Sequence, residues 1–286
     1  MSFAVAGLRQ FVIDVLDKKS VFERDAAIVA DCWVAADLAG TPELGTRLLP
    51  DAVEAINTAS IDPRAQILTL TETPAVALLD GSTGLGPVAA TRAIELAIEK
   101  AKQVGTGTVV VKNSRPVGNL SVYARKLADA GLIGQIITAG GPAKHALTDG
   151  SKPIASAGRV ARSLPISDGS PLIVRDMLAP PHTGLAFVLD MLTGPLSGRK
   201  PPILKKRDPQ IEGDEHFVYA IDPEQLIGRE TFDKRMVMVM QELEDADREH
   251  LQPAESTAET IELTAEHQAE LEAVGKTVGV PVPWES

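Results

Sequence analysis

The residues best suited to binding chemistry lie in a glycine-rich turn and a polar loop on either side of one long helical pattern. The turn, GSTGLG at 81–86, follows an apolar run, so its backbone amides could meet an anion at the start of a helix. Its glycine spacing differs from the G-x-G-x-x-G dinucleotide fingerprint, and Lys100 and Lys102 stand where an acidic ribose partner is expected. We therefore interpret the turn as a tight strand-to-helix connection. The loop, NSRPVG at 113–118, contributes Arg115, whose guanidinium fork suits a carboxylate.

Other familiar catalytic patterns are missing from the sequence. The histidines are scattered, with no pair four residues apart and no thiolate partners, so we expect no metal site; they are His145, His182, His216, His250 and His267. There is no G-x-S-x-G elbow, which argues against nucleophilic hydrolysis. The single cysteine, Cys32, stands in an apolar helical stretch, and we expect it to be buried packing.

The apolar periodicity predicts an α/β chain. Residues 140–213 are rich in proline and glycine and show one clear helix, so we expect long loops there. Elsewhere spacings of three and four predict helices, and β-branched apolar runs predict strands. The expected helices are 3–16, 26–38, 87–104, 121–130, 183–192, 229–249 and 265–274, and the expected strands lie within 67–80, 106–112, 132–138 and 217–222.

Composition limits the classes of partner. The net charge of -11 argues against nucleic acid and anionic membrane surfaces, because Lys and Arg are outnumbered and form no long run. The sequence shows neither a secretion signal at its start nor an apolar run of about 20 residues. With one cysteine available, these features predict a soluble cytoplasmic protein that binds neither nucleic acid nor membrane.

Several segments together resemble the type 2 malate/L-lactate dehydrogenase family, whose members are nicotinamide-dependent but lack a Rossmann fold. Their order and spacing agree along most of the chain. The matching segments are ADLAG at 36–40, RLLP at 47–50, TPAVALLDGSTGLG at 73–86, AIELAIEKA at 93–101, VVVKNS at 109–114 with Gly118, AGLIGQIIT at 130–138, HTGLAFVLDMLTGPLSG at 182–198 and EHFVYAIDPEQL at 215–226.

The resemblance implies the family's non-Rossmann α/β fold, with a large mixed sheet, helices and a helical N-terminal lobe. It also implies a homodimer, NAD or NADP as cofactor, and a small 2-hydroxy or 2-oxo acid as substrate. The expected parts are a helical lobe at 1–75 that packs with the C-terminal helices, a central α/β domain at 76–228 with a shortened cofactor region, and C-terminal helices at 229–286.

The family's motif positions carry different residues in this chain. The family's Ser-His-Gly tripeptide falls on Glu43, Leu44 and Gly45, and its second histidine falls on Pro116. The cofactor lysine is replaced by Thr183. Hydride transfer needs a proton carrier and a cation for the carboxylate. The candidate catalytic residues are Glu43, Tyr123 and His182 as proton carriers with Arg47 and Arg115 as carboxylate clamps, and the candidate cofactor residues are Asn113, Ser114, Gly118, Arg159, Asp176 and Gly184.

Three functions are compatible with these residues. The first is a nicotinamide-dependent dehydrogenase or reductase of a small 2-hydroxy or 2-oxo acid, which uses the substitute residues. The second is a binding or regulatory subunit that keeps the scaffold without redox chemistry. The third is an isomerase, lyase or hydratase that acts on a small carboxylic acid without nicotinamide.

Overall fold

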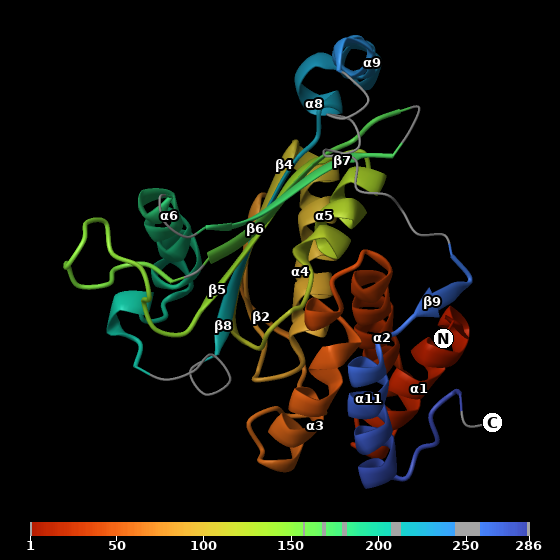
Figure 1. Ribbon diagram of the computed structural model, residues 1–286. Helices are drawn as coiled ribbons and strands as arrows, with labels where there is room; N and C mark the ends of the chain where they lie inside the picture. Colours follow the sequence, from red (N-terminus) through yellow and green to blue (C-terminus); the bar gives the residue numbers. More distant parts are fainter. Residues whose placement is uncertain are drawn as a thin grey trace.

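The computed structural model describes residues 2–156, 158–167, 170–178, 182–206, 213–243 and 258–284. Its centre is a mixed seven-stranded sheet with the strand order β2-β3-β4-β8-β5-β6-β7, in which only β3 and β4 pair in parallel (Figure 1). The strands are β2 (Leu68–Glu72), β3 (Val76–Asp80), β4 (Thr106–Ser114), β5 (Ile133–Gly140), β6 (Gly158–Leu164), β7 (Leu172–Leu178) and β8 (Asp214–Ile221).

Helices cover both faces of the sheet. On one face α4 (Gly86–Val104) and α5 (Leu120–Asp129) bury their apolar stripes against Val109, Ile136 and Val218. On the other face α6 (Thr183–Thr193) packs over Val110, Ile137 and Phe217. Figure 1 shows α6 on the opposite side of the sheet from α4 and α5. Residues of α6 and α5 are thus separated by the sheet.

A helical lobe lies beside the α4 and α5 face. It contains α1 (Val5–Lys18), α2 (Glu23–Leu38), α3 (Leu49–Asn57) and the distant α11 (Ala265–Val278), which share one apolar core. Two short strands, β1 (Ser2–Ala4) and β9 (Thr260–Glu262), pair at the edge of the lobe. Between α2 and α3 run two 3-10 turns, η1 (Pro42–Leu44) and η2 (Thr46–Leu48).

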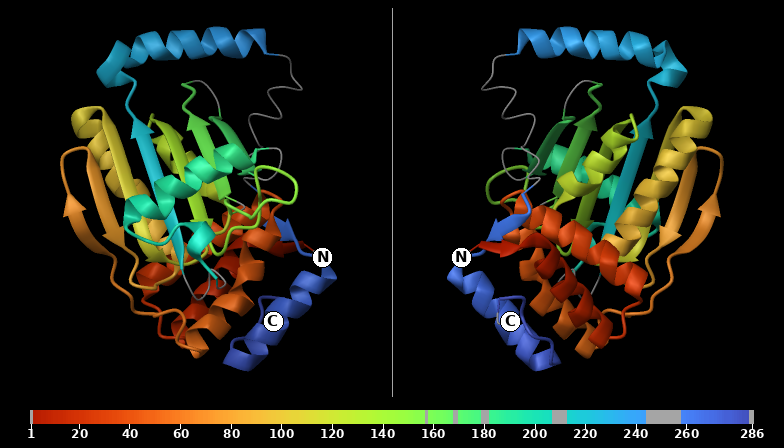
Figure 2. Two further views of the ribbon diagram at one scale, coloured as in Figure 1. Left: turned by 90° about the vertical axis from the view of Figure 1, so that its left-hand side faces the viewer. Right: turned by 90° about the vertical axis from the view of Figure 1, so that its right-hand side faces the viewer.

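The helices α8 (Glu224–Ile227) and α9 (Arg229–Glu242) stand off one end of the sheet (Figure 2). They expose large apolar side chains, namely Leu226, Ile227, Met238 and Val239. Two further 3-10 turns, η3 (Pro195–Ser197) and η4 (Pro202–Leu204), follow α6.

The predicted α/β class, with a large mixed sheet and a helical N-terminal lobe, is confirmed. The helix expected at 183–192 is confirmed as α6, but the expectation that loops make up the rest of 140–213 is wrong, because β6 and β7 pair there in antiparallel register. Neither GRVARSL nor LIVRDML has a regular apolar period, because arginines interrupt the first and an Arg-Asp pair interrupts the second, so neither segment predicts a strand. The sheet also begins at β2, before the predicted boundary at residue 75. The last part of the helix predicted at 229–249 lies outside the described residues.

The glycine-rich turn brings the start of α4 into close contact with the polar loop. Ser82 and Thr83 both have positive φ angles, and Thr83 donates its N–H to the Asn113 carbonyl at 2.8 Å. A Cβ on Gly86 would lie 2.1 Å from the Arg115 carbonyl oxygen. Glycine is therefore needed at this contact, and the turn has the strand-to-helix role expected from its spacing.

Candidate functional site

Polar side chains from four neighbouring strands share the sheet face that carries α5 and the loop at 115–119. The register pairs Asp214 with Gly140, His216 with Thr138, and Thr138 with Arg159. Directly paired residues point to the same face of a sheet. Because Arg175 pairs with Ala161, two residues along from Arg159, it joins the same face. The side chains thus form a row from β8 through β5 and β6 to β7.

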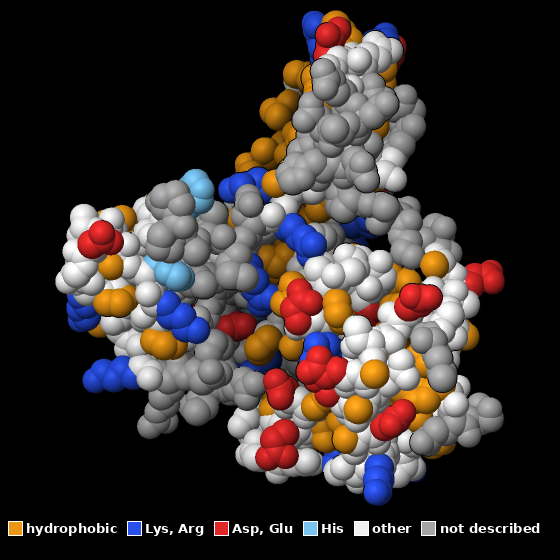
Figure 3. Space-filling model, viewed as in Figure 1, with side chains coloured by type: hydrophobic (Ala, Val, Ile, Leu, Met, Phe, Trp, Pro, Cys, Tyr) orange, Lys and Arg blue, Asp and Glu red, His pale blue; other side chains and the backbone are white. Residues whose placement is uncertain are grey.

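A pocket of about 200 Å³ opens along this row, and we call it the acid pocket. Arg159 and Lys144 supply two cations, while Thr138 and Asp214 supply a hydroxyl and a carboxyl group. In Figure 3, Lys and Arg side chains gather along the middle of the visible face, between the sheet and the helical lobe. The lining residues are Pro116, Thr138, Ala139, Gly140, Pro142, Lys144, Arg159 and Asp214.

Asp214 is held over the end of β5. A Cβ on Gly140 would lie only 1.5 Å from Asp214 Oδ1, so the carboxyl group occupies the space that a side chain would need. Burial lowers the pKa of Arg159, and the charge of Asp214 acts in the opposite direction. Asp214 therefore balances part of the guanidinium charge and still lines the acid pocket.

His216 is buried directly beneath the pocket. Its Nδ1 lies 3.0 Å from Thr138 Oγ1 and its Nε2 lies 2.7 Å from Ser114 Oγ. Burial, with a smaller contribution from the Arg159 charge, lowers the pKa of His216 to about 3. The neutral imidazole therefore fixes the Thr138 hydroxyl in the pocket wall.

A second pocket of about 210 Å³ lies on the other side of Arg159, and we call it the arginine pocket. Arg159 Nη1 donates to the Gly118 carbonyl at 3.2 Å, which holds the guanidinium between the two pockets. Gly118 has a φ of +80°, and a Cβ added at this position would lie 2.5 Å from the Leu44 carbonyl oxygen. The lining residues are Leu44, Gly118, Asn119, Leu120, Arg159, Val160 and Arg175.

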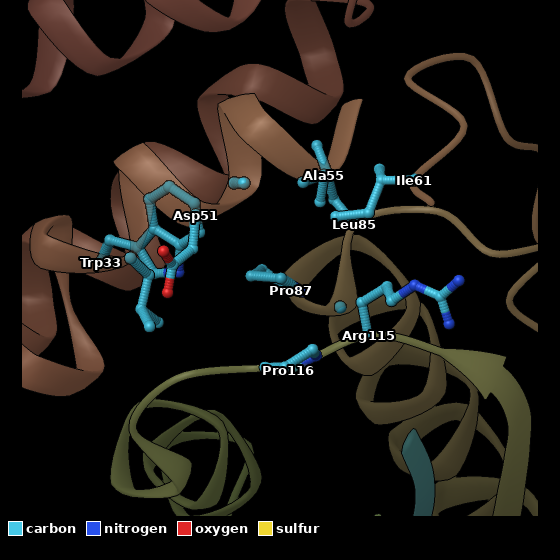
Figure 4. Close-up of a pocket in the computed structure, with 11 residues that line it drawn as sticks. Trp33, Asp51, Ala55, Ile61, Leu85, Pro87, Arg115 and Pro116 are labelled. Atoms are coloured by element: carbon cyan, nitrogen blue, oxygen red, sulfur yellow. The ribbon is translucent and has the colours of Figure 1, made fainter. Parts of the chain in front are cut away.

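A smaller, apolar pocket of about 50 Å³ lies between α3, the start of α4 and Pro116. Figure 4 shows Trp33, Leu85 and Pro87 around it, with the Arg115 guanidinium directed away from them. That guanidinium donates to the Ser60 carbonyl from Nε at 3.0 Å and to the Ser114 carbonyl from Nη1 at 3.3 Å. Burial lowers its pKa. Arg115 thus joins the polar loop to the helical lobe.

The other predicted catalytic residues also have structural partners or lie elsewhere. Arg47 pairs with Glu270 and Glu266 of α11. Tyr123 is fully buried and donates to the Val117 carbonyl at 2.8 Å. Glu43 is exposed in η1. The clamping and proton-transfer roles of these residues stay predictions, and the cations that line the acid pocket are Arg159 and Lys144.

Three of the predicted cofactor residues form the polar loop. Asn113 binds the Asp80 carboxylate through Nδ2 at 2.9 Å, and Ser114 binds His216. Of these three, Gly118 lines the arginine pocket. Asn113 and Ser114 therefore support the loop, and Gly118 lies with Arg159 at a pocket.

Two further predicted residues, His182 and Gly184, are not brought to this face. His182 and Gly184 lie at the start of α6, across the sheet from α5. Asp176 is in β7 opposite Val160, but its side chain lies outside the described residues. The sheet therefore separates His182 from the acid pocket.

Sequence reasoning missed Thr138, Lys144, Asp214 and Arg175. Thr138 ends the apolar run of β5 and Asp214 opens β8, so polar residues at strand ends were the available signal. Within the described residues no group of three or more His, Cys, Asp and Glu is arranged to hold a metal ion. No helix among them is long and apolar enough to cross a membrane.

Comparison with known proteins shows the family of the chain. The model of the malate/L-lactate dehydrogenase family matches residues 3–179, which is more than half of the chain. The chain belongs to the malate/L-lactate dehydrogenase family. The resemblance predicted from the sequence segments is therefore confirmed.

Relatives within the family support the assignment. The chain is 40% identical over 135 residues to L-sulfolactate dehydrogenase of Methanocaldococcus jannaschii, covering 47% of this chain and 39% of the relative. It is 36% identical over 204 residues to malate dehydrogenase of Pyrococcus abyssi, covering 71% and 52%. In these alignments the chain thus spans about half the length of its relatives or less.

Solved structures of the family share the fold. The sulfolactate dehydrogenase from Methanocaldococcus jannaschii superposes with a TM-score of 0.86 at 23% identity, covering 99% of this chain and 98% of that one. Malate dehydrogenase from Pyrococcus horikoshii OT3 gives 0.82 at 25% identity, covering 99% and 97%. Leu44 lines the arginine pocket and Pro116 lines the acid pocket, so both lie next to Arg159.

Proposed function

We propose that this protein binds a small 2-hydroxy or 2-oxo acid in the acid pocket and interconverts the two with a nicotinamide dinucleotide. The observation that carries the proposal is that Arg159, Lys144 and Asp214 line one pocket of a malate/L-lactate dehydrogenase fold. Dehydrogenation of lactate, malate or sulfolactate, which the relatives' names describe, involves acids of this kind.

Each group has a defined part in the proposed reaction. The Arg159 guanidinium binds the carboxylate in a forked geometry, and Lys144 adds a second charge at the pocket mouth. Asp214 takes the hydroxyl proton on an oxygen of its carboxylate when the acid is oxidised and returns it when the oxo acid is reduced. Pro116 covers one side of the pocket with apolar surface and limits the entry of water.

The residues around the arginine pocket fit a nicotinamide dinucleotide. Two guanidiniums and the glycine Gly118 surround it, and phosphate groups bind such donors. A bound nicotinamide supplies or accepts the hydride at C2 of the acid. The choice between NAD and NADP belongs to the proposal, since the relatives' names do not decide it.

A binding or regulatory subunit is the second candidate. It is favoured by the lining of the acid pocket, which contains no histidine among its described residues. An isomerase, lyase or hydratase is the third, with Asp214 and Lys144 as the acid and base of the same pocket.

Titration calorimetry on the purified chain separates these functions. We expect binding of L-malate or L-lactate, binding of NADH or NADPH in the micromolar range, and cofactor oxidation with the matching 2-oxo acid. Binding of the acid without any binding of millimolar cofactor would contradict the dehydrogenase. Proton NMR of the acid incubated without cofactor then tests the third candidate, because conversion gives new resonances and a binding subunit gives none.

We also propose a homodimer in the cytoplasm. The exposed apolar residues of α8 and α9, with Leu226 72% and Met238 55% exposed, need cover that a second copy can provide. We expect sedimentation equilibrium to give twice the chain mass and Met238→Lys with Leu226→Lys to shift it toward the monomer. A monomeric unsubstituted chain at micromolar concentration would refute the dimer. The proposed cytoplasmic location is supported by the single cysteine, Cys32, which is buried and free.

A further inference from the structure

Arg175 has a position that the acid pocket does not explain. It lies in β7, two residues along from the partner of Arg159, so the two side chains are diagonal neighbours on one sheet face. Both line the arginine pocket. In the described part of the chain no carboxylate lies within ion-pair distance of Arg175, and its side chain is exposed.

Two neighbouring guanidiniums repel each other, so such a pair is more stable with an anion between them. The neighbouring Arg162 provides a useful contrast. It lies on the opposite face of β6 and donates to Gln135 Oε1 at 2.7 Å, as expected of a surface residue. The arginines of this strand pair therefore divide into Arg162, a surface contact on one face, and Arg159 with Arg175 at a pocket on the other face, where Asp214 balances part of the Arg159 charge.

We propose that Arg159 and Arg175 form a pyrophosphate site in the arginine pocket. The proposal rests on the nicotinamide-dependent function above and names the groups that hold the phosphates. A pyrophosphate carries two negative charges and several acceptor oxygens, which match two forked donors better than one carboxylate does.

The position also suits a ligand that spans two pockets. Arg159 separates the acid pocket from the arginine pocket and lines both. A dinucleotide anchored by its phosphates at Arg175 can therefore reach the acid held on the far side of Arg159.

Calorimetry with ADP-ribose and inorganic pyrophosphate tests the site without requiring any turnover. We expect Arg175→Gln to weaken both ligands about tenfold, because one charge-assisted hydrogen-bonding group is lost from an exposed position. Arg162→Gln removes the same charge from the opposite face and is the matched control, with no expected change. Thermal melting of both variants checks folding, and we expect little change since both side chains are exposed.

A second comparison separates this site from the acid pocket. We expect Lys144→Gln to weaken the binding of L-malate while leaving the binding of ADP-ribose unchanged. We expect Arg175→Gln to weaken the binding of ADP-ribose while leaving the binding of L-malate unchanged. Equal ADP-ribose affinity in Arg175→Gln and the unsubstituted chain would overturn the pyrophosphate site, as would failure of the unsubstituted chain to bind either probe. If the unsubstituted chain binds ADP-ribose but not L-malate, the result contradicts the proposed function and not the pyrophosphate site.

Discussion

The substitution Arg159→Gln is expected to weaken binding of a 2-hydroxy acid by about 100-fold, because it removes a half-buried charge that forms forked hydrogen bonds. Glutamine is two atoms shorter than arginine, so the hydrogen bond from Nη1 to the Gly118 carbonyl is lost together with the charge. Binding of ADP-ribose is expected to weaken as well, since Arg159 lines both pockets. Titration calorimetry with the 2-hydroxy acid and with ADP-ribose measures the two dissociation constants.

The same variant has a readout that does not depend on any ligand. The Arg159 charge helps to lower the pKa of His216 to about 3, although burial is the larger cause. In Arg159→Gln we expect the pKa of His216 to rise but to stay below 6.5, as measured by NMR of the imidazole carbons. Arg162→Gln, on the opposite face, should leave both the pKa and the affinity unchanged. An unaltered acid affinity in Arg159→Gln would remove Arg159 from the acid pocket.

The fold could be predicted where local pattern and burial agree. The helix α4 has a clear apolar stripe, and β4 is a β-branched run buried on both faces, so both follow from the sequence alone. The strands β6 and β7 could not, because each is short and has no regular apolar period, and the segment around them is rich in proline. They form strands because β6 pairs with β5 and β7 pairs with β6, and these are tertiary interactions.

The candidate site was harder to predict for the same reason. Arg159 could be named from the family pattern, but its neighbours Thr138 and Asp214 join it only through the register of β5, β6 and β8. Arg47 and Arg115 have the right chemistry for a carboxylate, yet Glu270 and the Ser60 carbonyl engage them. A residue type therefore indicates what a side chain can bind, and the packing decides which partner it meets.

Long-range packing also creates a buried carboxyl group that no local pattern suggests. Asp37 of α2 accepts the Thr46 N–H at 3.0 Å and contacts the Thr46 hydroxyl, which lies 2.8 Å from His267 Nε2 of α11. Burial raises the pKa of Asp37 to about 7, and the nearby charge of Glu43 acts in the same direction. Burial also lowers the pKa of His267, with Arg47 adding to the effect and Glu270 opposing it.

The raised pKa makes the stability of the helical lobe depend on pH. Below a pH of about 3, Asp37 is largely protonated in both the folded and unfolded chains. As pH rises toward 7 the unfolded chain releases this proton first, so folding loses stability over that range. Between pH 5 and pH 7 the loss from this group is about 2 kcal/mol, because the slope of about 1.4 kcal/mol for each pH unit flattens as pH approaches the folded pKa.

We therefore expect Asp37→Asn to remove most of this decline. Its free energy of unfolding, measured by urea denaturation, should rise relative to that of the unsubstituted chain by about 3 kcal/mol between pH 5 and pH 8. The comparison isolates Asp37, because His267 is present in both chains. Glu54→Gln removes an exposed carboxylate from α3 of the same lobe and serves as the control. Parallel pH profiles for Asp37→Asn and the unsubstituted chain would show that Asp37 is ionised in the folded lobe throughout, with Thr46 and His267 stabilising its charge.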